Sequence, residues 1–300
     1  MARDGNGRGA QPFEFTHLDR VYWPGLGLTK GDLVACYRAV APIVLPHLRD
    51  RPFTIKRHYT VPRGPFEWIK DAPPETPPWV RTTAQPARSR GGAPVHYILV
   101  DDERTLLWLV EFGAVDLHVW PSRADRPDRP DFALFDLDPA RGATFADVVA
   151  AARLLRDALA GLGLDAVPMT TGGDGMHVRV PLARAHDHEQ VREFVRVVGR
   201  ALASAAGGLV TLERRPERRH GVFLDAKMNG HGQQLVAPYS VRPLPGAPVS
   251  TPLAWDEVDG KLDPTTFTPQ VVGERVARLG DLAEPLLRGR QRLARALAAL

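Results

Sequence analysis

The stretch FALFDLD at residues 132–138 decides the fold, because it reads as a buried strand that ends in two carboxylates. The chain continues with a helical pattern at 145–159, two strands at 166–171 and 176–182 joined by Gly172-Gly173, a helix at 188–203 and a strand at 221–226. This β-α-β-β-α-β order is that of the split ferredoxin-like unit, which RNA-recognition modules share. The sequence therefore predicts an α+β fold around this unit.

The order of the strands in space follows from their connections. Right-handed crossovers leave a gap between the first two strands, the third strand fills it, and the fourth pairs outside the first. The strand of Asp136 and Asp138 is then flanked by the strand that begins near His177 and by the strand that ends at Asp225. We expect these polar residues, which are far apart in the sequence, to meet at one site.

Asp136 and Asp138 are two residues apart on a strand, so their side chains leave the same face. Two neighbouring carboxylates repel unless a cation or a proton lies between them, and Mg²⁺ or Mn²⁺ with oxygen ligands meets that need. With Asp225, such a pair suits a two-metal site for phosphoryl transfer. The alternative is structural: one aspartate caps a helix, one pairs with an arginine, and Asp225 is a strand-end charge facing solvent. The spacing alone leaves this alternative open.

The turn TTGGDGMH at residues 170–177 places glycines, which permit a close backbone approach to a phosphate, before a histidine. It is not a Walker A loop, because it lacks the Gly-Lys-Ser/Thr ending, and a plain hairpin turn is the alternative. Lys56, Gln233 and Arg242 fall on or near predicted strands, where each taken alone is better explained as a surface group. His118, taken alone, is typical of a partly buried histidine with satisfied hydrogen bonds.

The segment before residue 131 predicts a second, α/β module. Thr29 reads as a helix N-cap, and Pro42 and Pro46 are expected to end or bend that helix. The proline-rich segment 62–90 reads as a loop, whereas regular elements are expected as strands at 51–59, 95–100, 116–120 and 234–240 and a helix at 102–114. We expect a single domain over 1–300, made of an N-terminal module at 12–130, the split unit at 131–245 and a C-terminal helical packing segment at 246–300.

Composition sets wide limits on function. The 300 residues are 44% hydrophobic, which suffices for a sizeable core, and the net charge of +4 is compatible with a polyanionic partner. The single cysteine, Cys36, excludes a disulfide or a thiolate metal cage within one chain. No apolar run approaches the roughly 20 residues of a membrane span. We expect a cytoplasmic, nucleoid-associated protein without membrane contact.

Several motifs occur in a characteristic order along nearly the whole chain. They are LDRVYWP at 18–24, LTKGDL at 28–33, RPFTIKR at 51–57, LHVW at 117–120, DLD at 136–138, GGDGMH at 172–177 and VAPYSVR at 236–242. In this order they resemble the archaeo-eukaryotic primase superfamily, and most closely the polymerase domain of the bacterial end-joining (LigD-type) DNA ligase and its stand-alone primase-polymerase relatives. The resemblance implies a primase-polymerase fold, with the split unit packed against the N-terminal module.

The resemblance also implies a function: a metal-dependent DNA/RNA polymerase, or nucleotidyltransferase, that adds nucleotides, often ribonucleotides, at short gaps or broken DNA ends. Two Mn²⁺ or Mg²⁺ ions are implied on Asp136, Asp138 and Asp225. Positions that match nucleotide contacts are Lys56, His118, Thr171, Gly173, His177, Lys227, Gln233 and Arg242. Positions that match DNA contacts are Arg20, Lys30, Phe66, Trp68 and Lys70, the first two at a 5′-phosphate. Asp174 departs from the family, because relatives often carry lysine there.

The implied substrates are NTPs or dNTPs and DNA with a gap, an overhang or a 5′-phosphate, and the implied partners are a separate DNA ligase and an end-binding protein. Priming is one alternative activity. A non-catalytic DNA end-bridging module is another, but such sheets carry aromatics on the third strand, and residues 176–180 offer none. A metal-dependent nuclease would share the carboxylates but would not need basic residues that bind a triphosphate. Repair by end joining or gap filling is the preferred interpretation.

Overall fold

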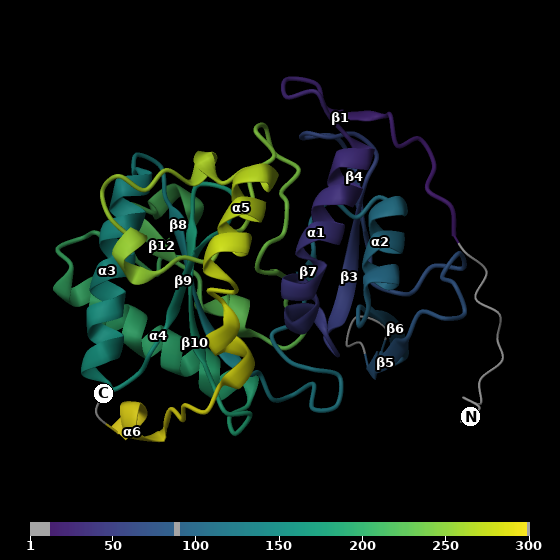
Figure 1. Cartoon of the computed structure of the whole chain (residues 1–300). Coiled ribbons are helices and arrows are strands. Elements are labelled where there is room, and N and C mark those ends of the chain that lie inside the picture. The colour runs from purple at the N-terminus through teal and green to yellow at the C-terminus, as the bar shows by residue number, and fades with distance from the viewer. Residues whose placement is uncertain (1–12, 87–90, 299–300) are drawn as a thin grey trace.

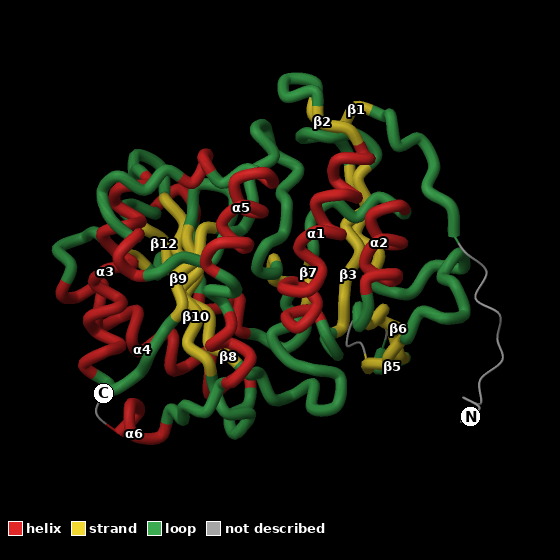
Figure 2. The backbone as a smooth tube through the Cα atoms, viewed as in Figure 1, coloured by secondary structure: helices red, strands yellow, loops and turns green. Residues whose placement is uncertain are grey.

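The computed structural model describes residues 13–86 and 91–298. Two β-sheets with their helices stand side by side, and Figure 1 shows the N-terminal half in purple and blue beside a C-terminal half in teal, green and yellow. Figure 2 shows the strands of the C-terminal half at its centre with helices around them, and α1 and α2 beside β3 in the N-terminal half. The α+β fold expected from the sequence is confirmed.

The N-terminal half is built on a sheet with the order β13-β7-β3-β6-β5, and β4 pairs with β3 as a branch. Its strands are β3 Pro52–His58, β4 Phe66–Ile69, β5 Thr82–Pro86, β6 Pro94–Leu99, β7 His118–Val119 and β13 Leu235–Val236. A separate hairpin pairs β1 Val21–Trp23 with β2 Leu28–Thr29, and the helices are α1 Lys30–Leu48 and α2 Glu103–Glu111. Because β13 pairs with β7, the chain returns to this sheet after the split unit is complete.

Helix α1 begins where the capping pattern places it. The Thr29 hydroxyl accepts from the Asp32 N–H, and the Asp32 carboxylate accepts from the Thr29 N–H at 2.7 Å. The helix does not end at Pro42 or Pro46 but runs to Leu48. Proline removes one helical hydrogen bond at each position, and the burial of the surrounding turns offsets that loss through Val40, Ala41, Val44 and Leu48.

Segment 62–90, expected to be a loop, carries two strands, and this corrects the sequence interpretation. Phe66, Glu67 and Trp68 of β4 are all exposed, so no alternation of buried and exposed residues marks this strand in the sequence. β4 is held by antiparallel pairing with β3, and β5, which is also mostly exposed, is held by pairing with β6. Pairing with neighbouring strands of the sheet, rather than a local sequence pattern, stabilises β4 and β5.

The C-terminal half is built on a sheet with the order β11-β12-β8-β10-β9. Its elements are β8 Phe132–Pro139, α3 Phe145–Gly161, β9 Val167–Thr170, β10 Met176–Pro181, α4 His188–Ala205, β11 Val210–Thr211 and β12 Val222–Leu224. The expected spatial order of fourth, first, third and second strand is confirmed, and β11 adds an edge strand parallel to β12. The register sets His177 opposite Asp136 and Phe223 opposite Asp138.

The last described part of the chain contains α5 Pro269–Leu279 and α6 Ala294–Ala298, and short 3₁₀ helices lie at Pro216–Arg218, Ala226–Asn229, Trp255–Glu257, Pro264–Thr266 and Glu284–Arg288. This part is bound to the end of α1 through Asp281. The Tyr239 hydroxyl donates to Asp281 Oδ1 at 2.8 Å, and His47 Nε2 lies 2.8 Å from Oδ2. None of the helices in the described ranges has the length and apolar character needed to cross a membrane.

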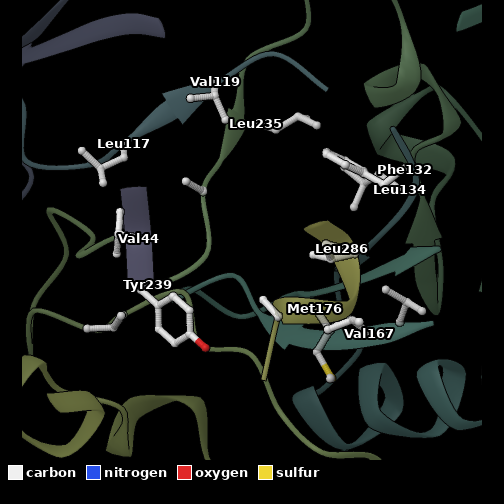
Figure 3. Packing of buried hydrophobic residues seen from close by; sticks show 14 of the residues in the cluster. Val44, Leu117, Val119, Phe132, Leu134, Val167, Met176, Leu235, Tyr239 and Leu286 are labelled. Atoms are coloured by element: carbon white, nitrogen blue, oxygen red, sulfur yellow. The ribbon is translucent and has the colours of Figure 1, made fainter. Parts of the chain in front are cut away.

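One hydrophobic core runs through both halves. Figure 3 shows labelled members from the first sheet, such as Val119 and Leu235, and from the second, such as Leu134 and Met176. The buried Tyr37 hydroxyl donates to the Val115 carbonyl at 2.7 Å and accepts from the Val241 N–H at 3.0 Å. Full burial of one such aliphatic or aromatic side chain contributes about 1.5–3 kcal/mol. The shared core therefore fixes the two sheets relative to each other.

Candidate active site

The three aspartates singled out in the sequence lie on neighbouring strands. Asp136 is buried on β8, Asp138 is exposed two residues later, and Asp225 directly follows β12. The Asp225 N–H donates to the Asp136 carbonyl at 3.0 Å, which fixes the third residue beside the first. One Asp225 carboxylate oxygen accepts from the Lys227 N–H at 2.9 Å and so caps the next 3₁₀ helix. Within residues 13–86 and 91–298, no three acidic, histidine or cysteine side chains form a closed metal-binding group.

The carboxylates nevertheless act on one another electrostatically. The pKa of Asp138 is raised to about 7, first by desolvation and then by the negative charges of Asp136, Asp174 and Asp225, while Arg219 opposes the shift. Asp138 keeps part of its surface exposed, but the surrounding protein atoms and the neighbouring carboxylates together make ionisation unfavourable. A cation that binds carboxylate oxygens relieves this repulsion, so the chemistry of the donor set fits Mg²⁺ or Mn²⁺.

His177 on β10 connects to the first aspartate. Its Nε2 lies 3.2 Å from Asp136 Oδ1, and its Nδ1 lies 3.3 Å from a guanidinium nitrogen of Arg179. A guanidinium only donates, so Nδ1 accepts and the ring proton sits on Nε2, where it donates to Asp136. Burial lowers the pKa of His177, and it lowers the pKa of Arg179 to about 9. The arginine also donates to the Val236 carbonyl at 2.6 Å, which joins this strand to β13.

The glycine-rich turn is packed between Asp138 and Arg242. Gly172 has φ +73°, and a Cβ built there would come within 2.5 Å of Arg242 Cγ. Arg242 donates to the Thr171 carbonyl at 2.6 Å, beneath the turn. On the other side, a Cβ at Gly175 would come within 2.7 Å of Asp138 Oδ1. Glycine is therefore required at both positions for close approach, and the turn, the arginine and the carboxylate form one assembly.

A buried carboxylate that sequence reasoning missed, Asp116, organises the basic residues of the first sheet. Its Oδ2 lies 3.3 Å from Lys56 Nζ and 2.9 Å from His118 Nε2, and its Oδ1 lies 3.0 Å from His58 Nε2. Arg242 Nε is 3.7 Å from the same carboxylate. Burial raises the pKa of Asp116, but the hydrogen bonds from His118 and His58 outweigh it and hold the pKa well below its usual range.

Asp116 and His58 carried a weak signal in the sequence. Asp116 and His118 are two apart and therefore share a strand face, as do Lys56 and His58 on β3. The sequence did not reveal that Lys56, His58 and His118, which come from two strands, all contact the Asp116 carboxylate. Nor did it reveal that Arg242 lies close to the same carboxylate. Burial lowers the pKa of His118, which favours the uncharged imidazole beside Asp116.

Two exposed aromatic rings stand next to this cluster. Phe66 and Trp68 alternate along β4, opposite His58 and Lys56 of β3. Lys56 Nζ lies 4.5 Å from the centre of the Phe66 ring and 5.6 Å from that of Trp68, and Trp68 meets His118 edge-on at 5.0 Å. The aromatic pair and two of the residues matched to nucleotide contacts are thus brought together.

The other sequence candidates lie around this centre. Lys70, Lys227 and Gln233 line a cavity of about 930 Å³. Arg20 is exposed and donates to the Tyr59 carbonyl at 2.7 Å. Lys30 is buried instead: its Nζ lies 2.7 Å from a carboxylate oxygen of Glu111 and donates to the Thr16 carbonyl at 2.9 Å. Its ammonium group therefore already has two partners inside the protein.

Comparison with known proteins identifies this arrangement. A sequence model described as the LigD primase-polymerase domain matches residues 29–283. The chain belongs to the LigD primase-polymerase domain family. This domain is a template-directed nucleotidyltransferase, and the family is metal-dependent. The family membership expected from the ordered motifs is confirmed.

The chain is also similar to individual LigD proteins in sequence and in structure. The chain is 32% identical over 287 residues to the multifunctional non-homologous end joining DNA repair protein LigD of Mycobacterium tuberculosis, covering 92% of the chain and 37% of the relative. It is 29% identical over 269 residues to the bifunctional LigD of Bacillus subtilis, covering 89% of the chain and 43% of the relative. The chain thus spans less than half the length of these relatives. The polymerase domain of Mycobacterium tuberculosis ligase D, solved in complex with DNA, superposes with a TM-score of 0.86 at 30% identity, covering 94% of this chain and all of that one.

Proposed function

We propose that this chain is a polymerase that adds nucleotides to DNA primers at short gaps or broken ends, in end joining or gap-filling repair. The observation that carries the proposal is the assembly around the glycine-rich turn. Asp138 lies on one side of the turn and Arg242 on the other, and Asp116 links Arg242 to Lys56 and His118. Carboxylates for metal ions and cations for phosphates are therefore juxtaposed, as nucleotidyl transfer requires.

We propose Asp136, Asp138 and Asp225 as the ligands of two Mg²⁺ or Mn²⁺ ions. When bound, such ions activate the attacking hydroxyl and stabilise the leaving oxygen. The protein's own part is to hold the ligands: the His177 N–H orients Asp136, and the backbone bond from Asp225 to Asp136 keeps the third carboxylate on the neighbouring strand. An N–H donor of this kind fixes a ligating carboxylate and tunes its basicity.

The nucleotide is assigned to the cationic side of the assembly. Arg242 and Lys56 supply positive charge for the triphosphate, and the glycine-rich turn at Thr171 and Gly173 permits a close backbone approach to it. His118 and His177, whose Nε2 atoms contact Asp116 and Asp136, are assigned to the same region. Lys227 and Gln233, which line the cavity of about 930 Å³, are assigned to the sugar and base of the nucleotide. A preference for ribonucleotides is part of the proposal.

The DNA is assigned to the exposed aromatic pair and to nearby cations. Phe66 and Trp68 present flat apolar faces, and stacking of a base on an aromatic side chain is worth about 1–3 kcal/mol. Arg20, Lys30 and Lys70 are the proposed phosphate contacts, the first two for a downstream 5′-phosphate. The buried ammonium group of Lys30 must then exchange the Glu111 carboxylate for that phosphate. Sealing is assigned to a separate DNA ligase and bridging to an end-binding protein, with the chain working at the nucleoid.

The test is primer extension on DNA with a one-nucleotide gap, with and without a downstream 5′-phosphate. Ribo- and deoxyribonucleotides are compared under Mn²⁺ and Mg²⁺. We expect metal-dependent addition of the templated nucleotide, stimulation by the phosphate and a preference for NTPs. Duplex binding without incorporation under either metal would overturn the polymerase proposal. Extension that ignores the phosphate would remove the role proposed for Arg20 and Lys30.

A further inference from the structure

Beyond the end of β12, the edge of β8 is paired by a side chain instead of a strand. β12 ends at Leu224, and the Asp225 N–H then donates to the Asp136 carbonyl. Leu134 lies two residues earlier on β8, is fully buried and meets the side-chain amide of Asn229. Its N–H donates to Asn229 Oδ1 at 2.7 Å, and Asn229 Nδ2 donates to its carbonyl at 2.8 Å. The amide therefore pairs with β8 as the backbone of a neighbouring strand would.

The hydrogen bonds of Asp225 and Asn229 attach one short loop to β8 at two points. The two points are the carbonyl of Asp136 and the backbone of Leu134, which lie roughly 7 Å apart along the strand. Between them the chain forms the 3₁₀ helix that Asp225 caps, with the Lys227 N–H donating to Asp225 Oδ1 at 2.9 Å. The Asp225 carboxylate therefore belongs to a closed loop, and the Asn229 amide fixes the far end of that loop.

Asn229 is also held from its other side. It is 2% exposed, and its backbone carbonyl lies 3.0 Å from Nδ1 of His188, the first residue of α4. The other ring nitrogen of His188, Nε2, lies 3.0 Å from the carbonyl of Pro127, in the loop before β8. Because α4 packs against both β8 and the 3₁₀ helix, Asn229 is anchored in the core. A residue anchored in this way serves as the fixed end of the loop.

A structural role is the simpler explanation, because buried N–H and C=O groups need partners and Asn229 supplies both partners of Leu134. Two observations favour a role in the site. Residues 226–228 of the loop are half-buried or exposed, so hydrogen bonds contribute much of what fixes the shape of the loop. The amide also joins the strand that carries Asp136, so a change in the length of this link moves Asp225 relative to Asp136.

We propose that Asn229 is a positioning residue for Asp225: its amide sets the distance between the Asp225 carboxylate and the two aspartates of β8. Asn229 is buried and acts only through Asp225. A displaced carboxylate binds a shared divalent cation less tightly, because such cations need several oxygens that converge at fixed distances. The proposal rests on the proposed function in one respect, which is the assignment of Asp225 as a ligand of Mg²⁺ or Mn²⁺.

The test measures metal affinity without catalysis. Free Mn²⁺ is measured by electron paramagnetic resonance while the full chain is titrated with the ion, without nucleotide or DNA. Asn229→Ala should weaken Mn²⁺ binding about tenfold, as the loss of a residue that orients a metal ligand does. Asn229→Gln keeps the amide on a side chain one carbon longer, so it should recover most of the melting temperature but not the Mn²⁺ affinity. Recovery of both would show that Asn229 only satisfies Leu134, and it would overturn the proposal.

Gln291→Ala is the matched control. The Gln291 amide forms the same pair of bonds with one residue: Oε1 accepts from the Asp165 N–H at 2.7 Å, and Nε2 donates to the Asp165 carbonyl at 2.9 Å. Nε2 also donates to the carbonyl of Pro181, at the opposite end of β10 from His177. Gln291→Ala should therefore lower the melting temperature and leave the Mn²⁺ affinity unchanged. If Asn229→Ala does not fold, the Mn²⁺ affinity of Asn229→Gln is compared with those of the wild type and Gln291→Ala.

Hydrogen exchange of the metal-free protein gives a second measurement. In EDTA, Asn229→Ala should speed the exchange of the Asp225 and Lys227 amide protons, because the loop that carries them has lost its far attachment. Gln291→Ala should leave both exchange rates unchanged. Unchanged exchange at both amides in Asn229→Ala would overturn the proposal.

A double-mutant cycle separates this inference from the metal assignment. Asp225→Asn should weaken Mn²⁺ binding at least as much as Asn229→Ala does. The double variant should bind Mn²⁺ no more weakly than Asp225→Asn alone, because Asn229 acts through Asp225. Losses that add in the double variant, or a normal affinity in Asn229→Ala beside a weakened Asp225→Asn, would overturn this inference alone. A normal Mn²⁺ affinity in Asp225→Asn would instead overturn the metal assignment of the proposed function, and this inference with it.

Discussion

His177 donates from Nε2 to Asp136 at 3.2 Å, across two paired strands, and Arg179 fixes the tautomer that makes this possible. The two aspartates of β8 therefore differ. Asp136 is buried and held by a donor, whereas Asp138 is exposed and surrounded by other carboxylates. Of these two proposed metal ligands, Asp136 is positioned by the protein, whereas ionisation of Asp138 becomes favourable when a cation binds.

Replacing either aspartate should strongly slow nucleotide addition. We expect Asp136→Asn and Asp138→Asn to lower the rate of single-nucleotide extension on the order of 10³-fold, because a metal ligand supports several kcal/mol of transition-state stabilisation. Asp157→Asn, an exposed change on α3, is the matched control and should retain full activity. Near-normal rates in either site variant, with an unchanged melting temperature, would contradict the metal assignment.

The raised pKa of Asp138 makes the stability of the metal-free protein depend on pH. The folded pKa, about 7, lies above the ordinary value of 3.8, so the folded state binds the proton more tightly than the unfolded state. The free energy of unfolding should therefore fall as pH rises from about 4 to about 7. Asp138→Asn should flatten this part of the profile, measured by urea unfolding in EDTA.

The repulsion between Asp138 and the neighbouring carboxylates also predicts that a divalent metal ion stabilises the folded protein. At pH 7.5, Mn²⁺ should raise the melting temperature of the wild-type protein, because a ligand that binds only the folded state stabilises it. The increase should be much smaller in Asp138→Asn and unchanged in Asp157→Asn. If Mn²⁺ raised the melting temperature of all three proteins equally, the ion would bind at another site.

Removing the buried charge of Asp116 should damage both stability and nucleotide binding. Asp116→Asn leaves Lys56 without its counter-charge, and breaking a buried ion pair costs about 3–5 kcal/mol. We also expect a higher KM for the nucleotide, because Lys56 and His118 lose their common partner. Asp281→Asn is the control: it disrupts a hydrogen-bond network at His47 and Tyr239, so it should lower stability without raising KM.

Sequence patterns predicted the second sheet better than the first, for a physical reason. The split unit consists of apolar strands and well-capped helices whose right-handed connections leave one strand order, so Asp136, His177 and Asp225 could be placed together. β4 has no buried face, and its pairing with β3 is non-local. The role of Asp116 could not be predicted for the same reason. Its partners Lys56 and His58 lie on another strand, so the contacts that surround this carboxylate are non-local.

The left-handed Gly172 should be essential for placing Arg242. Gly172→Ala brings a methyl group to 2.5 Å from Arg242 Cγ and imposes a positive φ on an L-residue, which costs about 1–2 kcal/mol. Gly142→Ala carries the same backbone cost at φ +89° but meets no atom within 4 Å. Both variants should therefore lose some stability, and only Gly172→Ala should show a higher KM for the nucleotide. Equal KM values would mean that the Arg242 side chain is not held by the turn.

Asp174 should limit nucleotide affinity. This exposed carboxylate lies in the turn and helps to raise the pKa of Asp138. Asp174→Lys replaces a charge that repels the triphosphate with one that attracts it. At the surface we expect on the order of 1 kcal/mol, or about a fivefold to tenfold lower KM for the nucleotide, since solvent screens exposed charges. Asp174→Asn should give about half of this free-energy gain, and both gains should shrink as salt rises from low to high concentration. A KM that stays constant in Asp174→Lys at low salt would show that the triphosphate does not approach the turn.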